Sequence, residues 1–138
     1  MGVLIDTSVL VAHERGRLEL DRLAAKVVRE RADEPFYISV ITVSELLHGA
    51  RRAGDRVRQA RRTAFVEGVI EAFPALPIDL PTARTHADLA ADLAAGGRPV
   101  GTHDLWIAAS ALVRGLSLAT LNVREFRRVP GLRVEVWG

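Results

Sequence analysis

The chain has 138 residues, of which 49% are hydrophobic, a formal net charge of +2 and no cysteine. This length fits one domain with a full apolar core, and the lack of cysteine excludes a disulfide scaffold and thiolate metal sites and favours a reducing, cytoplasmic setting. No apolar run approaches the ~18 residues of a membrane span and no signal-peptide pattern opens the chain, so we expect no membrane association.

Apolar runs typical of strands alternate along the chain with helical patterns. The expected strands cover residues 2–6, 36–40, 75–79, 116–120 and 132–137. The expected helices cover residues 8–16, 18–32, 42–54, 55–72, 81–97, 102–115 and 122–129, with glycines at several of their ends. Continuous apolar strands separated by helices predict an α/β fold with a mostly parallel central sheet flanked by helices. We expect one domain over residues 1–138.

Three of the seventeen acidic residues stand apart from the charged surface segments. Asp6 follows the apolar run "GVLI", Glu45 lies within "ISVITVSELL", and Asp104 precedes "LWIAASALV". All three lie near the start of an expected helix, and the first two follow a strand directly. The carboxyl edge of a parallel sheet is where open α/β folds bind ligands, so we expect these acids to share one site.

Helix capping is the alternative explanation for these acids, because acidic side chains are favourable in a first helical turn. Asp6 fits an N-cap position, and both "TVSE" at 42–45 and "NVRE" at 122–125 fit the capping-box pattern. Capping does not require apolar residues on both sides of the acid, however, and it does not explain why the acids gather at one edge of the sheet. A shared site is therefore the better interpretation.

Carboxylates in one cleft repel each other unless one of them is protonated or a cation lies between them. Oxygen ligands suit hard divalent ions, so the expected cation is Mg²⁺, with Mn²⁺ as a second choice. Among the histidines, His48 lies one helical turn after Glu45 and could reach the rim of the cleft, whereas His103 is expected to face away from Asp104, and His13 and His86 to lie at the surface.

Four segments in register resemble the PIN-domain ribonucleases, specifically the VapC toxins of bacterial and archaeal toxin–antitoxin pairs. They are "LIDTSVLVA" at 4–12, "ITVSELLHGA" at 41–50, "GTHDLWIAASAL" at 101–112 and "LATLNVREFRRVPGL" at 118–132. The resemblance spans nearly the whole chain. It implies a PIN-like fold and catalytic, metal-binding roles for Asp6, Glu45 and Asp104.

The fourth acidic position of the family falls in "TLNVREF", where many PIN domains have an aspartate and this chain has Asn122. Glu125 is the nearby acid, so either Asn122 or Glu125 is the candidate that completes the metal site. Hydroxyls beside these positions, at Thr7, Ser8 and Thr120, are candidates to orient a carboxylate or a bound water from behind.

Arginine supplies eighteen of the nineteen basic residues, because Lys26 is the only lysine. Six arginines fall between residues 51 and 62, next to the helix that carries Glu45. Arginine binds phosphate through paired hydrogen bonds, so Arg58, Arg61 and Arg62 are candidate RNA contacts. The alternatives are an ordinary solvated helix face and a face that binds a second subunit or the antitoxin.

The resemblance implies a Mg²⁺-dependent endoribonuclease toxin that cleaves structured RNA, forms a homodimer and is neutralised by a VapB-like antitoxin. Two other functions stay open on the residues. A catalytically weak or inactive PIN fold that binds RNA or protein is favoured by Asn122. A phosphoryl-accepting receiver domain also gathers acids at a sheet edge, but it needs a lysine there, and Lys26 lies in a charged helix far from that edge.

Overall fold

The structure, a computed structural model, describes residues 2–30 and 34–137. Its centre is a five-stranded sheet in the order β3-β2-β1-β4-β5, and every neighbouring pair is parallel. The strands are β1 (Val3–Ile5), β2 (Phe36–Ser39), β3 (Ala75–Leu76), β4 (Ser117–Thr120) and β5 (Val134–Val136). The expected α/β fold is confirmed, and the described sheet is parallel throughout.

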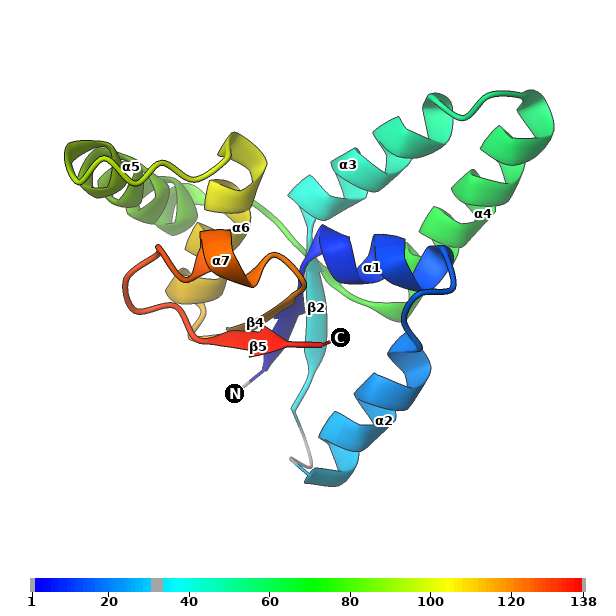
Figure 1. Ribbon diagram of the computed structural model, residues 1–138, viewed down its shortest axis with the longest axis horizontal. Helices are drawn as coiled ribbons and strands as arrows, with labels where there is room; N and C mark the ends of the chain where they lie inside the picture. The colour runs from blue at the N-terminus through cyan, green and yellow to red at the C-terminus, as the bar shows by residue number, and fades with distance from the viewer. Residues whose placement is uncertain (1, 31–33, 138) are drawn as a thin grey trace.

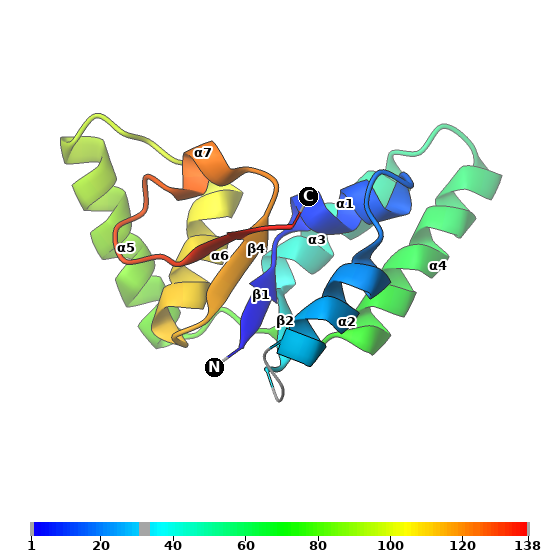
Figure 2. The ribbon, with the colours of Figure 1, turned by 60° about the horizontal axis from the view of Figure 1, so that its bottom comes forward.

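Seven helices connect the described strands. They are α1 (Thr7–Glu14), α2 (Leu20–Glu30), α3 (Val40–Arg51), α4 (Arg56–Ala72), α5 (Leu80–Ala95), α6 (Thr102–Val113) and α7 (Val123–Phe126). Figure 1 shows α1 to α4 on one side of the sheet and α5, α6 and α7 on the other, an arrangement that Figure 2 repeats from a second direction. No helix in the described ranges is long and apolar enough to cross a membrane.

The central strand β1 is buried on both faces, which explains its uninterrupted apolar sequence. Val3 and Ile5 pack into the core formed with α1 to α4, whereas Leu4, between them, packs into the core formed with α5, α6 and α7. This alternation follows from the two-residue period of a strand. Fully burying one such side chain stabilises the fold by roughly 1.5–3 kcal/mol, so the position of Asp6, directly after β1, is held firmly.

Local chemistry explains where the elements depart from the expected bounds. β3 is only two residues long because Pro77, which follows it, has no backbone N–H to donate to the sheet. α3 begins at Val40, and the Ser39 side chain caps it by accepting from the Ile41 N–H over 3.0 Å. The capping box expected at 42–45 is therefore wrong, because Thr42 already lies inside the helix and is fully buried.

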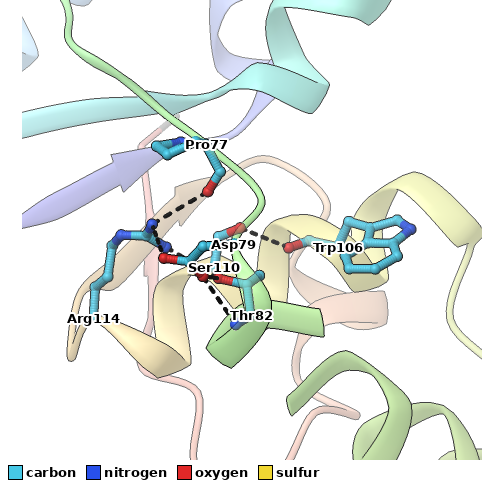
Figure 3. A network of polar contacts seen from close by, with 6 residues as sticks. All are labelled: Pro77, Asp79, Thr82, Trp106, Ser110 and Arg114. Carbon is cyan, nitrogen blue, oxygen red and sulfur yellow. Dashed lines mark hydrogen bonds and ion pairs between the residues drawn. The ribbon is translucent and has the colours of Figure 1, made fainter. Parts of the chain in front are cut away.

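A polar network joins the start of α5 to the end of α6 (Figure 3). The Asp79 carboxylate caps α5 by accepting from the Thr82 N–H over 3.0 Å and from the Thr82 hydroxyl over 2.6 Å. Arg114, just after α6, donates to Asp79 over 3.2 Å and to the carbonyl oxygen of Pro77 over 3.2 Å. These bonds fix α6 against α5 and thereby help to position Asp104 at the opposite end of α6.

Candidate active site

The candidate site lies at the carboxyl edge of the sheet, between β1 and β4, where the order of the strands along the sheet reverses. From β1 the sheet continues to β2 and β3 on one side and to β4 and β5 on the other. Loops after β1 and β4 therefore diverge and leave a crevice between them, which is the usual ligand position in open α/β sheets. Asp6 follows β1, and Thr120 is the last residue of β4.

Asp6 is almost completely buried, with 2% of its surface exposed. Its Oδ2 accepts hydrogen bonds from the Ser8 hydroxyl over 2.7 Å and from the Thr120 hydroxyl over 2.8 Å. Its Oδ1 is buried and has no hydrogen-bond partner. Although Asp6 occupies the N-cap position of α1, its side chain makes no capping bond. Capping therefore does not explain this acid.

Asp104 lies in the first turn of α6 and faces the other carboxylates. Burial raises its pKa to about 7, and the negative charges of Asp6, Glu125 and Glu45 act in the same direction. Its Oδ2 accepts a hydrogen bond from the Asn122 amide over 3.2 Å. The three acids expected to share a site are thus close enough to act on one another electrostatically.

Glu45 reaches the site from α3. Its Oε1 accepts from the Thr7 hydroxyl over 2.9 Å, and that hydroxyl also lies 3.0 Å from the Thr42 hydroxyl. Its Oε2 lies 3.4 Å from Nδ1 of His103. The expectation that His103 faces away from the site is therefore wrong, because the first turn of α6 turns its imidazole toward α3.

The remaining histidines fall at other places. His48 is exposed on α3 and does not line the cleft. His86 is half-buried, contrary to expectation, because its ring stacks on Trp106 with the ring centroids 3.6 Å apart. His13 is also half-buried, and its Nδ1 lies 3.1 Å from the carbonyl oxygen of Leu18.

Asn122 lines the cleft, whereas Glu125 lies behind it and accepts a hydrogen bond from its side chain. The Asn122 amide lines the cleft and donates to Glu125 Oε2 over 2.9 Å, and the Gly101 N–H donates to Glu125 Oε1. These two donors hold the pKa of Glu125 below its usual value. The capping box expected at 122–125 is wrong, because the Asn122 side chain makes no capping bond to α7 and binds carboxylates instead.

The carboxylate cleft, as we call this hollow, has a volume of about 430 Å³. Its walls include Asp6, Ser8, Arg15, Glu45, Asp104 and Asn122. No sequence pattern pointed to Arg15, which lies just after α1, or to Gly101, and His103 was expected to face away from Asp104. The only signal for the last two was their place within the family-like segment at 101–112.

Arg58, Arg61 and Arg62 line a separate hollow of about 520 Å³ between α1, α3 and α4, which meets the carboxylate cleft at Arg15. Arg62 donates to the carbonyl oxygen of Gly49 over 3.3 Å and pairs with the Glu14 carboxylate at 3.5 Å. The three arginines therefore border the cleft rather than enter it. Part of their charge is already neutralised within the protein.

The donor set suits a hard divalent cation. In the described part of the chain, no three His, Asp or Glu side chains stand ready to enclose an ion by themselves. Mg²⁺ does not require such a cage, since it usually binds one or two carboxylates and completes its shell with waters and substrate phosphate. The unpartnered, buried Oδ1 of Asp6 and the crowded carboxylate of Asp104 are the two groups that a cation would satisfy.

Comparison with known proteins places this fold and site in a class. The family model of the PIN domain matches residues 3–132. Ribonuclease VapC1 of Rickettsia felis is 37% identical over 134 residues, covering 97% of this chain and 95% of that protein. The tRNA(fMet)-specific endonuclease VapC of Salmonella typhimurium is 42% identical over 100 residues, covering 72% of this chain and 74% of that protein.

Solved structures agree with the relatives found by sequence. A DNA-bound VapBC structure from Salmonella typhimurium matches with a TM-score of 0.87 and 34% identity, covering 100% of this chain and 99% of that chain. VapBC-1 from nontypeable Haemophilus influenzae matches with a TM-score of 0.86 and 28% identity, covering 99% of this chain and 98% of that chain. The chain belongs to the PIN-domain family and, within it, to the VapC ribonucleases.

Proposed function

We propose that this protein is a Mg²⁺-dependent endoribonuclease toxin, with Mn²⁺ as an alternative ion, whose active site is the carboxylate cleft. The observation that carries the proposal is the convergence of Asp6, Glu45 and Asp104 at one sheet edge, where burial, together with the negative charges of the neighbouring acids, raises the pKa of Asp104 to about 7. A fold gains no stability from gathering repelling acids around a hollow, so a bound cation is the simplest reason for them to be there.

The ligands assigned to Mg²⁺ are Asp6, Asp104 and, through water or directly, Glu45. Bound there, Mg²⁺ supplies activation of water and neutralisation of charge on the scissile phosphate and leaving oxygen. Ser8 and Thr120 hold Oδ2 of Asp6, which leaves Oδ1 for the ion. Catalysis by these residues is then largely a matter of positioning.

Asn122 completes the cleft in place of the family's aspartate, and Glu125 orients it. The Asn122 oxygen is a neutral ligand, and its amide hydrogens are already engaged by Asp104 and Glu125. A second cation would therefore be held weakly unless substrate phosphate contributed ligands. We assign Glu125 to orienting Asn122 rather than to direct metal binding, because its two oxygens accept from Gly101 and Asn122.

The substrate assigned to the cleft is structured RNA. The named activity of the Salmonella relative on tRNA(fMet) makes transfer RNA the first class to test. The VapBC structures make a VapB-like antitoxin the expected partner, and the family resemblance implies a homodimer in the cytoplasm. We expect the protein alone to cleave RNA and the bound antitoxin to prevent this cleavage.

The test is cleavage of a transfer-RNA pool by the purified chain with Mg²⁺, with Mn²⁺ and with EDTA. We expect cleavage with either ion and none with EDTA. Asp104→Asn should reduce cleavage by more than about a hundredfold, beyond the usual effect of residues that only support a metal ligand. Asp92→Asn, an exposed acid on α5, is the matched control and should cleave normally. Cleavage in EDTA, or by the Asp104 variant, would refute the metal-nuclease proposal.

A PIN fold that binds RNA without cutting it is the second candidate, and Asn122 in place of an aspartate is the observation that favours it. This candidate predicts RNA binding without cleavage under any metal condition. The receiver-domain alternative has no support at the cleft, because Lys26 is exposed and does not line it. Figure 1 shows α2, the helix that carries this lysine, away from the carboxyl ends of the strands.

A further inference from the structure

A second arginine-lined hollow lies on the opposite side of the carboxylate cleft from Arg58, Arg61 and Arg62. It has a volume of about 570 Å³ and is lined by Arg98, Arg124, Arg127 and Arg128 together with Gly97 and Pro99. We call it the α7 arginine pocket. Figure 1 shows α7 and the connection from α5 to α6 on one side of β1, with the connection from α3 to α4 on the other.

The pocket is attached to the active site through α7. Glu125 on this helix accepts from the Gly101 N–H, whereas Arg128, just after the helix, donates to the carbonyl oxygen of Pro99 over 2.9 Å. The segment from Pro99 to Gly101 is thus bonded at two points, to α7 beside the carboxylates and to Arg128, two residues after α7, in the pocket. With four residues at 1.5 Å each, α7 is only about 6 Å long.

In the described part of the chain, Glu125 partly compensates the charge of Arg128, whereas the charges of the other three arginines of the pocket have no such partner. Among the described residues, no carboxylate pairs with Arg98, Arg124 or Arg127, and all three side chains are exposed. By contrast, in the hollow beside α4, Arg62 pairs with Glu14. Guanidinium groups that converge without an acidic partner repel each other, and an anion removes this repulsion.

The lining favours phosphate over a protein partner. Apart from Pro99 it contains no apolar or aromatic side chain that would anchor a protein hot spot. Arginine matches phosphate through bidentate hydrogen bonds. We propose that the α7 arginine pocket binds RNA backbone phosphates next to the scissile one, so that the strand runs from the carboxylate cleft across α7. This inference rests on the proposed nuclease function and adds the path of its substrate.

The test measures binding of a transfer-RNA pool to the full-length chain at several salt concentrations, with EDTA present to prevent cleavage. The variant is Arg124→Ala with Arg127→Ala, which leaves the Arg128 bond to Pro99 in place. Each lost phosphate contact should reduce the salt slope by ~0.7 for a single strand. Between ~50 and ~200 mM salt, the affinity of the double variant should therefore fall about sevenfold less than that of the wild type.

Two further variants make the result specific. Arg98→Ala removes the charge that faces α7 from the other wall and should weaken binding in the same direction. Arg22→Ala with Arg29→Ala removes two exposed charges from α2 and should leave affinity and salt slope unchanged. Melting temperatures of all variants are measured alongside, so that a loss of folding is not mistaken for a loss of binding.

If the wild type binds and cleaves RNA while the α7 variants bind with the wild-type salt slope, the inference is overturned and the nuclease proposal stands. If the α7 variants change the oligomeric state or the affinity for the antitoxin but not that for RNA, the pocket is a protein contact and the inference is again overturned. Failure of the wild type to bind or cleave RNA would overturn both proposals. Weaker, flatter binding confined to the α7 and Arg98 variants supports the inference.

Discussion

The side-chain amide of Asn122 donates a hydrogen bond to the Asp104 carboxylate over 3.2 Å. An aspartate at position 122 would instead bring a further negative charge to a group that already includes Asp6, Glu45 and Glu125. The chain thus keeps a donor where its family often keeps an acid, and this donor reduces repulsion when no cation is bound.

The Asn122→Asp variant should be less stable than the wild type without a cation but should gain more stability from Mg²⁺. Loss of two donated hydrogen bonds and the added charge should lower the free energy of unfolding of the metal-free protein by about 1 kcal/mol or more. The additional carboxylate should also make the Mg²⁺-induced rise in melting temperature larger than in the wild type. Thermal melts in EDTA and in millimolar Mg²⁺ measure both effects.

Asn122→Ala is the control, because it removes the same hydrogen bonds without adding a charge. It should lower the stability in EDTA but should not enlarge the Mg²⁺ effect. A Mg²⁺ effect of equal size in the Asp and Ala variants would mean that position 122 does not contact the cation.

The approach of Asp6 and Glu45 could be predicted from the parallel sheet alone, whereas Asp104 follows no strand and comes from the first turn of α6, which α5 precedes in the chain. Strands that run the same way end at the same edge, so acids placed just after them meet whatever the details of packing. The start expected for the helix over 55–72 lies one residue from the observed start of α4, where the Asp55 carboxylate accepts from the Arg58 N–H.

Contacts between distant segments could not be predicted from local patterns. The bond from the Thr120 hydroxyl to Asp6 joins residues 114 positions apart, and His103 reaches Glu45 only because α6 packs near α3. The capping boxes failed for a related reason. Ser39 caps α3 one residue before the helix begins, and Asn122 binds carboxylates that lie near it only in the folded chain.

Asp104→Asn should stabilise the metal-free protein at neutral and higher pH. The variant removes a charge that burial and three nearby acids make unfavourable, while an amide can still lie beside Asn122. We expect a higher melting temperature than the wild type in EDTA at pH 8, together with the loss of cleavage. Asp92→Asn should change neither property. A lower melting temperature for Asp104→Asn would show that its charge stabilises the fold.

The pH dependence of stability should report the same carboxyl group. In the folded chain its pKa is about 7, above the ordinary value of 3.8, so the folded state binds more protons between these values. The contribution of Asp104 to stability is therefore lost as the pH rises from about 4 to about 7, and it stays lost above that. In EDTA, the stability gap between Asp104→Asn and the wild type should be small near pH 4 and largest above pH 7. A gap that does not change with pH would contradict the raised pKa.

His86→Phe should stabilise the contact between α5 and α6. The His86 ring stacks on Trp106, but its Nε2 is buried without a hydrogen-bond partner, and burial lowers its pKa below 6.5. Phenylalanine keeps the stacking and removes the unpaired nitrogen, for an expected gain of about 1 kcal/mol. Denaturant unfolding at pH 7 measures this gain.

The stability gained by His86→Phe over the wild type should increase as the pH falls. Because the folded state disfavours the charged imidazole, the wild type loses stability as the pH falls below 6.5, whereas phenylalanine does not titrate. His86→Ala, which loses the stacked ring, should be less stable than the wild type at pH 7. Equal stabilities of the Phe variant and the wild type at pH 5 would show that the nitrogen finds a partner in solution.

Arg62→Ala should act mainly on stability, although Arg62 was a candidate RNA contact. Its guanidinium joins α4 to the Gly49 carbonyl oxygen of α3 and to the Glu14 carboxylate of α1. Loss of these bonds should lower the free energy of unfolding by about 1 kcal/mol. Arg61→Ala is the matched control, because its side chain is exposed one position away, and it should unfold at the wild-type denaturant concentration. If both variants unfold like the wild type but bind RNA less tightly, these two α4 arginines contribute to RNA binding and not to the stability of the fold.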